Sequence, residues 1–431
     1  MKKVYMCLST DIIHTGHINI IKRAAEYGEV TVGVLIDEYV AIYEKPPIIP
    51  LEERMKIIEN IKGVTHVIIQ NDIFYDENLR KIKPDYVIHG DNWNRGYQKE
   101  VKERAAKVLQ EWGGQIIEIP YYKNEGLSLF DSYMQDSRGL PELRRQRLRM
   151  KIRKGEMVKV MVAYDGLSAL LVEKTSVENN GKRKQFDGIW LSSLCDSTVK
   201  GKPDIELVDL TSRIRNLEDI MEVTTKPIIF DADTGGLIEH FAYNIKTLER
   251  VGVSAVIIED KIGLKRNSLL GNEVEQHQDT IENFCQKIKT GKESVLSKNF
   301  MLIARVESLI LEMGVEDALE RAFAYVEAGA DGIMIHSRAA EPDEIFEFAD
   351  RFKSKYADIP LVAVPTTYNR VYEDQLKAHG FNIVIYANHL LRAAFPAMKK
   401  AACSILENER CYEASQECLS IKEILSLIPV K

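Results

Sequence analysis

Charged side chains follow short apolar runs in the C-terminal part of the chain, and their types suit an anion held beside a metal ion. Asp231 and Asp233 follow one run, Glu259 follows the next, and Arg305 and His336 follow two later ones. Carboxylate oxygens bind Mg²⁺ while water and substrate fill its remaining positions. Arginine presents a planar fork to a carboxylate or phosphoryl group, and histidine can donate to the same oxygens. We therefore expect a magnesium site that binds a small anionic substrate.

A second chemical cluster lies near the N-terminus, where the sequence reads His14-Thr15-Gly16-His17. It follows the first strand-like run and leads into a helical pattern. Histidines three residues apart at a helix N-terminus can both face a triphosphate, and the helix dipole favours its negative charge. Such a site can stabilise the charge on a pentacoordinate phosphorus and on departing pyrophosphate without covalent catalysis. We expect His14 and His17 to act in nucleotidyl transfer.

The residues of the first cluster require a scaffold that brings the ends of distant strands together. Apolar runs rich in Val and Ile recur, and each ends in a polar or charged residue. Most are separated by enough chain for a helix, and their lack of clean alternation is typical of strands buried on both faces. Such units predict a (β/α)₈ barrel, whose chemistry lies at the carboxyl ends of its strands. The runs are 158–163, 188–191, 227–230, 255–258, 301–304, 332–335, 361–364 and 383–387.

The first 120 residues have a different pattern, in which strand-like runs alternate with helical ones over short links. This alternation predicts a Rossmann-like, doubly wound parallel sheet. The expected strands are 4–8, 30–35, 66–70, 86–90 and 115–120, and the expected helices are 18–27, 51–61 and 97–112.

We place a nucleotide-binding domain at 1–134, a linker at 135–154 and the barrel at 155–431. The linker contains a strongly basic run at 141–154, PELRRQRLRMKIRK. We interpret this run as a solvated helix that joins two domains. The alternative, a patch for RNA or a membrane, conflicts with the acidic balance elsewhere.

Composition narrows the class of protein. The formal net charge of −7 argues against a nucleic-acid binder, because phosphate backbones recruit basic surfaces. The six cysteines show no CxxC pair and no zinc-like spacing, which fits a reducing cytoplasm. No signal-like segment and no apolar stretch long enough to span a bilayer is visible. We therefore expect a cytoplasmic enzyme with small-molecule substrates and no nucleic-acid or membrane partner.

The segment EDKIGLKRNS at 259–268 is similar to the lid of phosphoenolpyruvate mutase, a family of the isocitrate lyase superfamily. The resemblance of the barrel sequence to this family covers about 150–430. The KKCGH motif of the superfamily's C–C lyases is absent, which argues against that reaction. Further matches are AYDGLSA (163–169), GIWLSS (188–193), FDADTGG (230–236), ARVES (304–308), GADGIMIHSR (329–338), VPTTY (364–368) and YANHLLRAA (386–394).

This resemblance implies isomerisation of phosphoenolpyruvate to phosphonopyruvate, and it implies a role for each matching residue. Asp231 would bind Mg²⁺ directly, with Asp233 and Glu259 acting through its waters. The other residues would bind the substrate, hold the travelling phosphoryl group or close the lid: Trp190, Ser192, Ser193, Asp204, Lys265, Asn267, Ser268, Arg305 and His336.

One position departs from the family, because Ser193 stands where glycine is common beside the substrate carboxylate. Its hydroxyl could crowd a substrate oxygen or donate to it. A phosphonopyruvate hydrolase, in which water intercepts the phosphorus, remains the alternative for the barrel, and Asn267 on the lid favours the mutase. The resemblance also implies a homodimer or homotetramer with an exchanged C-terminal helix.

Residues 1–130 resemble the HxGH nucleotidyltransferases, in particular the glycerol-3-phosphate cytidylyltransferase branch. The matching segments are STD at 9–11 with HTGH, PLEERMKIIENI at 50–61, GDNW at 90–93 and NEGLS at 124–128. By this match His14 and His17 would stabilise the transition state. The other implied nucleotide-binding residues are Thr10, Lys45, Asp91, Trp93 and Ser128.

Departures from that branch fall where its acceptor would bind. Lys123-Asn124 replaces an expected Arg-Thr, and 62–65 lacks the expected arginine and acidic residue. Because lysine cannot reproduce the bidentate fork of arginine, we expect an acceptor other than glycerol phosphate. The domain pairing suggests CMP transfer from CTP to a phosphonate such as 2-aminoethylphosphonate or 2-hydroxyethylphosphonate. The alternative is a non-catalytic nucleotide-binding or dimerisation module.

Overall fold

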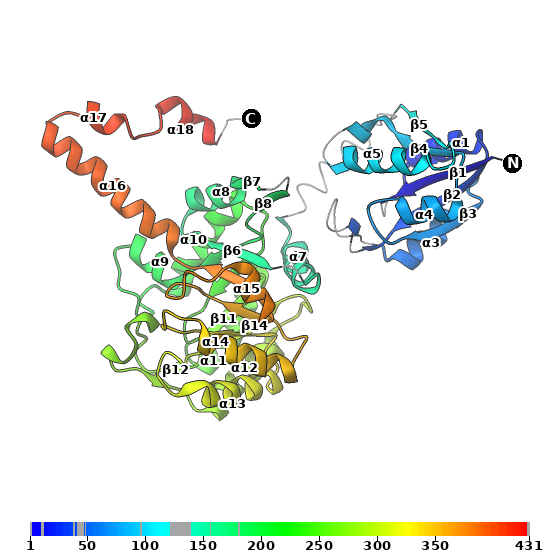
Figure 1. Cartoon of the computed structure of the whole chain (residues 1–431). Helices are drawn as coiled ribbons and strands as arrows, with labels where there is room; N and C mark the ends of the chain where they lie inside the picture. The colour runs from blue at the N-terminus through cyan, green and yellow to red at the C-terminus, as the bar shows by residue number, and fades with distance from the viewer. Residues whose placement is uncertain are drawn as a thin grey trace. The chain divides into compact units, whose positions relative to one another are not determined.

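The computed structural model describes residues 2–9, 13–37, 39–40, 47, 49–94, 97–120, 139–155, 157–179 and 182–428. The chain divides into two compact units, Met1–Asp136 and Ser137–Lys431 (Figure 1). The predicted site residues Thr10, Lys45 and Ser128 lie outside the described residues.

The described part of the first unit contains a parallel sheet with the strand order β3-β2-β1-β4-β5. The order reverses beside β1, so this is a doubly wound sheet, and ligands bind such sheets at the carboxyl ends of the strands beside this point. The predicted strands and helices are all present, and among the described residues the short helix α4 and the 3₁₀ helix η1 were not expected. The elements are β1 (Lys3–Leu8), α1 (Thr15–Ala25), β2 (Glu29–Leu35), α3 (Leu51–Glu59), β3 (His66–Gln70), α4 (Asp76–Ile82), β4 (Tyr86–Gly90), η1 (Asp91–Asn94), α5 (Tyr97–Leu109) and β5 (Gln115–Ile119).

Alternation along β1 divides the core of this unit between the two faces of the sheet. Val4 and Met6 pack with Ile21 of α1 and Ile58 of α3. Tyr5, between them, points to the other face, where it packs with residues of α4 and α5. Helices therefore cover both faces, as buried parallel strands require.

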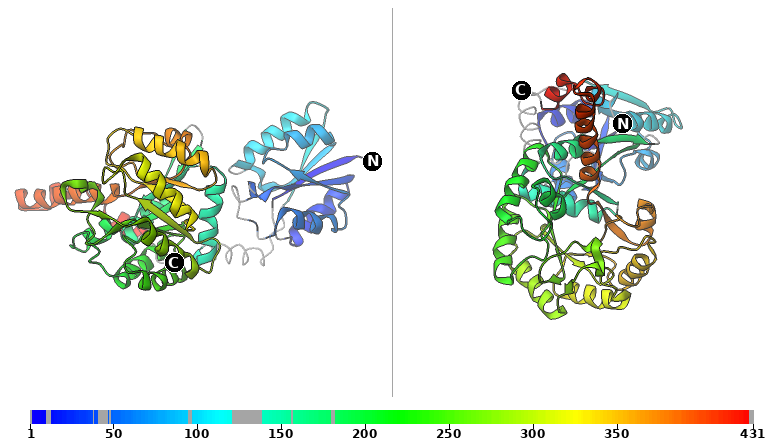
Figure 2. Two further views of the ribbon diagram at one scale, coloured as in Figure 1. Left: turned by 90° about the horizontal axis from the view of Figure 1, so that it is seen from below. Right: turned by 90° about the vertical axis from the view of Figure 1, so that its left-hand side faces the viewer.

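In the described part of the second unit, eight parallel strands close into a barrel, which confirms the predicted (β/α)₈ fold (Figure 2). Each strand coincides with one of the predicted apolar runs. The strands are β6 (Val158–Val162), β9 (Gly188–Leu191), β10 (Ile228–Asp231), β11 (Ala255–Glu259), β14 (Met301–Val306), β15 (Gly332–Ile335), β16 (Leu361–Ala363) and β17 (Phe381–Tyr386). The helices around them are α8 (Gly166–Lys174), α9 (Ser193–Val199), α10 (Leu210–Val223), α11 (Ile238–Val251), α12 (Ile281–Ser294), α13 (Gly314–Glu327), α14 (Asp343–Lys355) and α15 (Glu373–Ala378).

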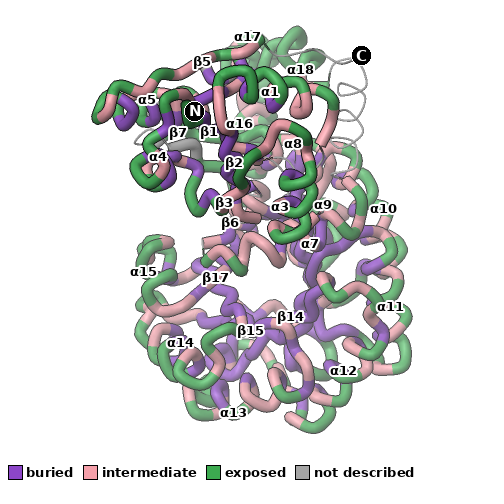
Figure 3. The backbone as a smooth tube through the Cα atoms, turned by 90° about the vertical axis from the view of Figure 1, so that its right-hand side faces the viewer, coloured by how far each residue is buried: buried purple, intermediate pink, exposed green. Residues whose placement is uncertain are grey.

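Two hydrophobic clusters build the barrel, and the strands are buried on both sides (Figure 3). On β14, for example, Leu302 and Ala304 point outward to the helices. Met301 and Ile303 point inward and pack with inward residues of the other strands. The barrel interior is therefore a filled core, as expected for this fold.

Helix α7 (Pro141–Arg153) is the predicted basic linker, and its environment corrects that prediction. The helix belongs to the second unit and packs on the amino-terminal ends of the barrel strands. Leu148 is fully buried in the interior cluster, and Arg144 donates to the carbonyl oxygens of Thr224 and Lys226 at 3.0 and 2.9 Å. Arg149 pairs with Asp331 at 2.7 Å. The charge run resembled a solvated face because its guanidinium groups bind carbonyl groups and carboxylates that are remote in sequence.

Several elements of this unit lie outside the barrel pattern. Two antiparallel hairpins, β7 (Ser176–Asn179) with β8 (Lys182–Gln185) and β12 (Lys261–Ile262) with β13 (His277–Gln278), were not predicted. The C-terminal segment forms α16 (His389–Asn408), α17 (Tyr412–Ser415) and α18 (Ile421–Leu427). Among the described residues, no helix combines the length and apolar character needed to cross a bilayer.

Candidate active site

The period of two along each strand places the functional side chains of the barrel. Inward positions alternate, so the last inward position of a strand lies at the top of the filled core. Ile229 precedes Asp231 by two residues and faces the interior cluster. The same spacing separates interior residues of β9, β11, β14 and β15 from Ser192, Glu259, Arg305 and His336.

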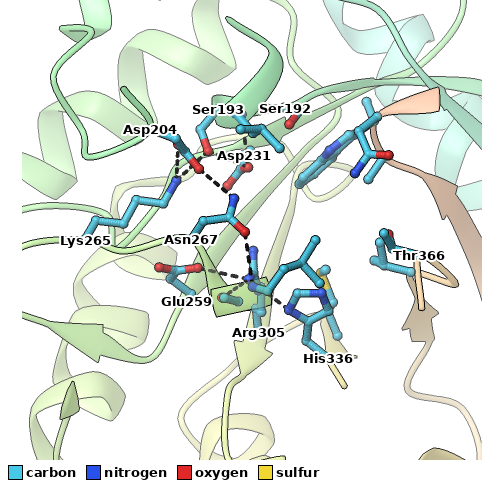
Figure 4. Close-up of a pocket in the computed structure, with 18 residues that line it drawn as sticks. Ser192, Ser193, Asp204, Asp231, Glu259, Lys265, Asn267, Arg305, His336 and Thr366 are labelled. Atoms are coloured by element: carbon cyan, nitrogen blue, oxygen red, sulfur yellow. Dashed lines mark hydrogen bonds and ion pairs between the residues drawn. The ribbon is translucent and has the colours of Figure 1, made fainter. Parts of the chain in front are cut away.

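These side chains meet in one cavity at the carboxyl ends of the strands (Figure 4). Most of the barrel residues singled out from the sequence line it. Asp233 is not among the lining residues, and it lies directly behind Asp231, to whose Oδ1 its backbone N–H donates at 3.2 Å. The predicted residues that line the cavity are Trp190, Ser192, Ser193, Asp204, Asp231, Glu259, Lys265, Asn267, Ser268, Arg305 and His336.

One side of the cavity is formed by residues 261–278, which we call the lid segment. It consists of the β12–β13 hairpin and the 3₁₀ turn η3 (Ser268–Glu273) between its strands. Lys265 Nζ donates to Asp204 Oδ1 at 2.6 Å, and Asn267 Nδ2 donates to Asp204 Oδ2 at 3.0 Å. Lys265 also pairs with Asp233. The lid segment is therefore seated on the carboxylates of the cavity.

Another part of the site is a buried charge network around Arg305, which also donates to Ser268 of the lid segment. Its Nε donates to Glu307 Oε1 at 2.6 Å, and its Nη2 lies 3.2 Å from Glu259 Oε2 and 3.0 Å from His336 Nδ1. Burial and the adjacent charge of Arg305 lower the pKa of His336, which favours a neutral imidazole. Burial opposes ionisation of Glu307, yet Arg305 and Lys261 hold its pKa well below the ordinary value.

The three predicted metal carboxylates differ in protonation tendency. Burial would raise the pKa of Asp231, but the charges of Lys265 and Arg305 outweigh it and hold that pKa below its ordinary value. Burial raises the pKa of Asp233, and it raises that of Glu259 to about 7. Of these three carboxylates, Asp231 is thus the one that the site keeps most firmly ionised.

This donor set fits a magnesium ion with few direct protein ligands. Oxygen donors suit Mg²⁺, which usually keeps several waters and takes one or two carboxylates. No three potential ligands among the described side chains are grouped closely enough to hold a metal by themselves. Buried Oδ1 of Asp233 and Oε1 of Glu259 have ion-pair partners but no hydrogen-bond donor among the described residues. One direct ligand at Asp231 with water-mediated contacts agrees with both observations.

Sequence reasoning missed two charged residues of this network. Glu307 is fully buried and contacts Arg305, Ser268 and His336. Its position two residues after Arg305, directly after the end of β14, was the available signal. Lys261 is 3 % exposed and contacts Glu259, Glu307 and three residues of the lid segment, Arg266, Ser268 and Gln276. Nothing in its local sequence indicated so many partners.

In the first unit, His14 and His17 cap the helix that follows β1. Nδ1 of His14 accepts from the backbone N–H of Gly16 at 3.0 Å, and Nδ1 of His17 accepts from that of His14 at 3.4 Å. The ring centroids are 3.7 Å apart. Because each Nδ1 accepts a backbone proton, the neutral rings carry their own protons on Nε2. Burial and the neighbouring His14 lower the pKa of His17 to about 4, so His17 is neutral at pH 7.

The other described residues of the predicted nucleotide site lie after β4. Asp91 is exposed at the end of this strand, beside the strand-order reversal. Trp93, by contrast, is fully buried and stacks on His89 with ring centroids 4.1 Å apart. In this structure its ring belongs to the core of the unit, so its contact with a nucleotide stays a prediction.

A closed parallel barrel with a polar cavity at the carboxyl ends of its strands is the architecture of a (β/α)₈ enzyme. Comparison with known families makes the assignment specific. The model of the phosphoenolpyruvate phosphomutase family matches residues 148–406, and the chain belongs to this family. A cytidylyltransferase-like family model matches residues 9–127.

Individual relatives agree with this assignment. The chain is 37% identical to a phosphoenolpyruvate phosphomutase of Tetrahymena pyriformis over 65% of this chain and 89% of the relative. A solved phosphoenolpyruvate phosphomutase from Streptomyces platensis subsp. rosaceus matches with TM-score 0.60 and 31% identity, covering 66% of this chain and 94% of that one. A solved phosphonopyruvate hydrolase in complex with oxalate and Mg²⁺ matches with TM-score 0.58 and 34% identity, over the same shares.

Proposed function

We propose that the barrel converts phosphoenolpyruvate to phosphonopyruvate and so forms a carbon–phosphorus bond. The observation that carries this proposal is the convergence of Asp231, Lys265, Asn267, Arg305 and His336 on one cavity beneath the lid segment. Membership of the phosphoenolpyruvate phosphomutase family supports it.

The residues divide the work of moving a phosphoryl group from oxygen to carbon. Asp231 would bind Mg²⁺ directly, and Asp233 and Glu259 would bind it through water molecules. The ion would supply positive charge that balances the enolate. Asn267, Arg305 and His336 bind the travelling phosphoryl group with hydrogen-bond donors, which stabilise the spread charge of a loose transition state. Asp204 steers that group, and its carboxylate also accepts hydrogen bonds from Lys265 and Asn267.

³¹P NMR tests the proposal directly. Phosphonopyruvate incubated with enzyme and Mg²⁺ should give phosphoenolpyruvate, with the phosphorus signal retained in organic form. Free phosphate and pyruvate as the products from the start would contradict the mutase assignment.

A phosphonopyruvate hydrolase is the second candidate, because the solved hydrolase is 34% identical to this chain over 66% of its length. In that reaction water attacks the phosphorus and the carbon–phosphorus bond breaks. Asn267, which donates to Asp204 from the lid segment, favours the mutase, because the lid excludes water from the phosphoryl group.

For the first unit we propose CMP transfer from CTP to a phosphonate, such as 2-aminoethylphosphonate or 2-hydroxyethylphosphonate. The neutral rings of His14 and His17 would direct their Nε2 protons to phosphate oxygens at the start of α1, where the helix dipole also favours negative charge. The cytidylyltransferase-like match over 9–127 and the phosphonate made by the barrel support this pairing.

Release of pyrophosphate from CTP, measured with a panel of phosphonates and with glycerol 3-phosphate, tests the first unit. We expect release with a phosphonate and little with glycerol 3-phosphate. No release with any acceptor would leave the unit as a nucleotide-binding or dimerisation module.

We also propose that the protein is a homodimer or homotetramer in which α16 docks on a second copy. No residue of this 20-residue helix is buried in the single chain. Phe395, Met398 and Leu406 are 67%, 61% and 79% exposed, and such contiguous apolar surface marks an interaction site.

A further inference from the structure

Ser193 lies between a carboxylate of the barrel and the lid segment (Figure 4). It begins α9 directly after the capping residue Ser192 and is 5 % exposed. Its Oγ donates to Asp231 Oδ2 at 2.9 Å and accepts from Lys265 Nζ at 2.7 Å. A hydroxyl can make both contacts at once, because it has one proton to donate and lone pairs that accept.

Asp231 does not depend on this hydroxyl for its orientation. The backbone N–H of Ser193 donates to the same Oδ2 at 3.1 Å, and the backbone N–H of Asp233 donates to Oδ1 at 3.2 Å. Removal of the Ser193 hydroxyl therefore leaves both carboxylate oxygens of Asp231 with a backbone donor.

Lys265 depends on the hydroxyl in a different way. Its other partners are the carboxylates of Asp204 and Asp233, and Asn267 of the lid segment also donates to Asp204. Asp204 lies in the connection between α9 and α10, so its contacts tie the lid segment to a loop. Ser193 ties the same segment to the end of β9, a fixed strand of the barrel, beside the ion pair of Lys265 with Asp233 after β10.

We propose that Ser193 is a positioning residue that holds the lid segment closed over the cavity. Its catalytic consequence rests on the proposed mutase function. A closed lid keeps water from the phosphorus during transfer. In an open cavity water adds to the phosphorus of phosphonopyruvate, the carbon–phosphorus bond breaks with its electron pair on carbon, and that carbon takes a proton. The products are then pyruvate and phosphate.

Hydrogen exchange of the full-length protein tests the closure without any substrate. The probes are the amides of residues 261–278 that are hydrogen-bonded in the β12–β13 hairpin and in η3. In Ser193→Ala we expect these amides to exchange about tenfold faster, because the lid segment loses one hydrogen bond to a charged group. Ser193→Thr keeps the hydroxyl and should restore the slow exchange. Ser212→Ala, which removes a hydroxyl on α10 away from the lid, is the control.

Two further measurements separate closure from metal binding. Calorimetric titration with Mg²⁺ should change by less than about threefold in Ser193→Ala, since Asp231 keeps its backbone donors. ³¹P NMR with phosphonopyruvate should show several-fold more phosphate relative to phosphoenolpyruvate than in wild type, and Ser193→Thr should reverse this.

Unchanged exchange of the lid segment in Ser193→Ala would overturn the inference. If that result came with a loss of Mg²⁺ affinity greater than about tenfold, Ser193 would act on Asp231 alone. If the wild-type enzyme formed no phosphoenolpyruvate, the proposed function would fall, and the exchange experiment would still decide the closure by itself.

Discussion

At the scale of single residues, neighbouring charges decide which groups in this protein are ionised. Asp231 and Asp233 are both buried, yet Lys265 and Arg305 keep the pKa of Asp231 low, whereas burial raises the pKa of Asp233. In the first unit burial acts on a base, and it lowers the pKa of His17. Identical residue types therefore differ in charge because of side chains that are remote in sequence.

The pKa of His17 predicts how the stability of the first unit depends on pH. The unfolded chain binds a proton at His17 near pH 6.5, and the folded unit binds it only near pH 4. Stability is therefore complete above about pH 6.5 and falls as the pH drops toward 4. We expect a loss of about 1–2 kcal/mol between pH 7 and pH 5 from this group.

Urea unfolding of the full chain at pH 7 and pH 5 measures this loss. Hydrogen exchange of the β1 and β2 amides serves as the probe for unfolding of the first unit. His17→Asn should remove the part of the pH dependence that His17 contributes and leave the part from His89, whose pKa burial also lowers, and the control His66→Asn, at an exposed position on β3, should keep all of it. Full pH dependence in His17→Asn would contradict the assignment to this residue.

At the scale of elements, α7 and the lid segment close the two ends of the barrel. Leu148 of α7 enters the interior cluster at the amino-terminal ends of the strands. Residues 261–278 lie at the carboxyl ends, where Lys265 and Asn267 reach Asp204. Helix α7 therefore contributes to the stability of the barrel, and the lid segment encloses the candidate active site.

Leu148→Ala tests the role of α7. Truncation of a fully buried leucine leaves a cavity at the base of the barrel, and we expect a loss of about 2–4 kcal/mol in the free energy of unfolding. Leu140→Ala, at a 50% exposed position just before the same helix, should change it by less than about 0.5 kcal/mol. Calorimetric unfolding of both variants measures the difference. Equal effects would show that α7 is a solvated linker after all.

At the scale of the whole molecule, two units with separate cores carry two separate candidate sites. The described contacts of Asp231 lie within the barrel unit, and those of His17 lie within the first unit. Each chemistry should therefore respond to substitutions in its own unit.

Asp231→Ala should reduce the conversion of phosphonopyruvate to phosphoenolpyruvate by at least about 10³-fold, because the Mg²⁺ anchor is lost, and should leave pyrophosphate release from CTP intact. His17→Ala should do the reverse, with a loss of about 10²-fold or more in CTP chemistry. ³¹P NMR and a pyrophosphate assay on the same preparations measure both activities. A folded variant that lost both activities would contradict the two-site interpretation.

The exposed face of α16 predicts the assembly. The double substitution Phe395→Glu with Met398→Glu places two charges on this face and should convert the oligomer to monomers, as measured by light scattering after gel filtration. Lys400→Glu, five residues after Phe395 and therefore on a different face of the same helix, is the control for added negative charge and should leave the oligomer intact. A wild-type protein that runs as a monomer would remove the proposed α16 interface.

Local pattern was sufficient for the two folds. The eight apolar runs and the alternating elements of the first 120 residues predicted the strands correctly, because burial on both faces imposes its composition on each strand by itself. The candidate residues at strand ends followed from the same reasoning, since Asp231, Glu259, Arg305 and His336 occupy the next inward positions.

Only the tertiary structure showed what those residues contact. The basic run at 141–154 predicted a solvated helix, yet Arg144 and Arg149 bind groups that follow it by about eighty residues or more. Glu307 and Lys261 belong to the site, and Trp93 belongs to a core. Ser193 bridges Asp231 and Lys265. Periodicity reports whether a position is buried, because the residues of one face recur at a fixed spacing along a helix or strand. The partner of a buried charge is a residue that the fold brings close from a distant part of the sequence. No local pattern therefore predicts it.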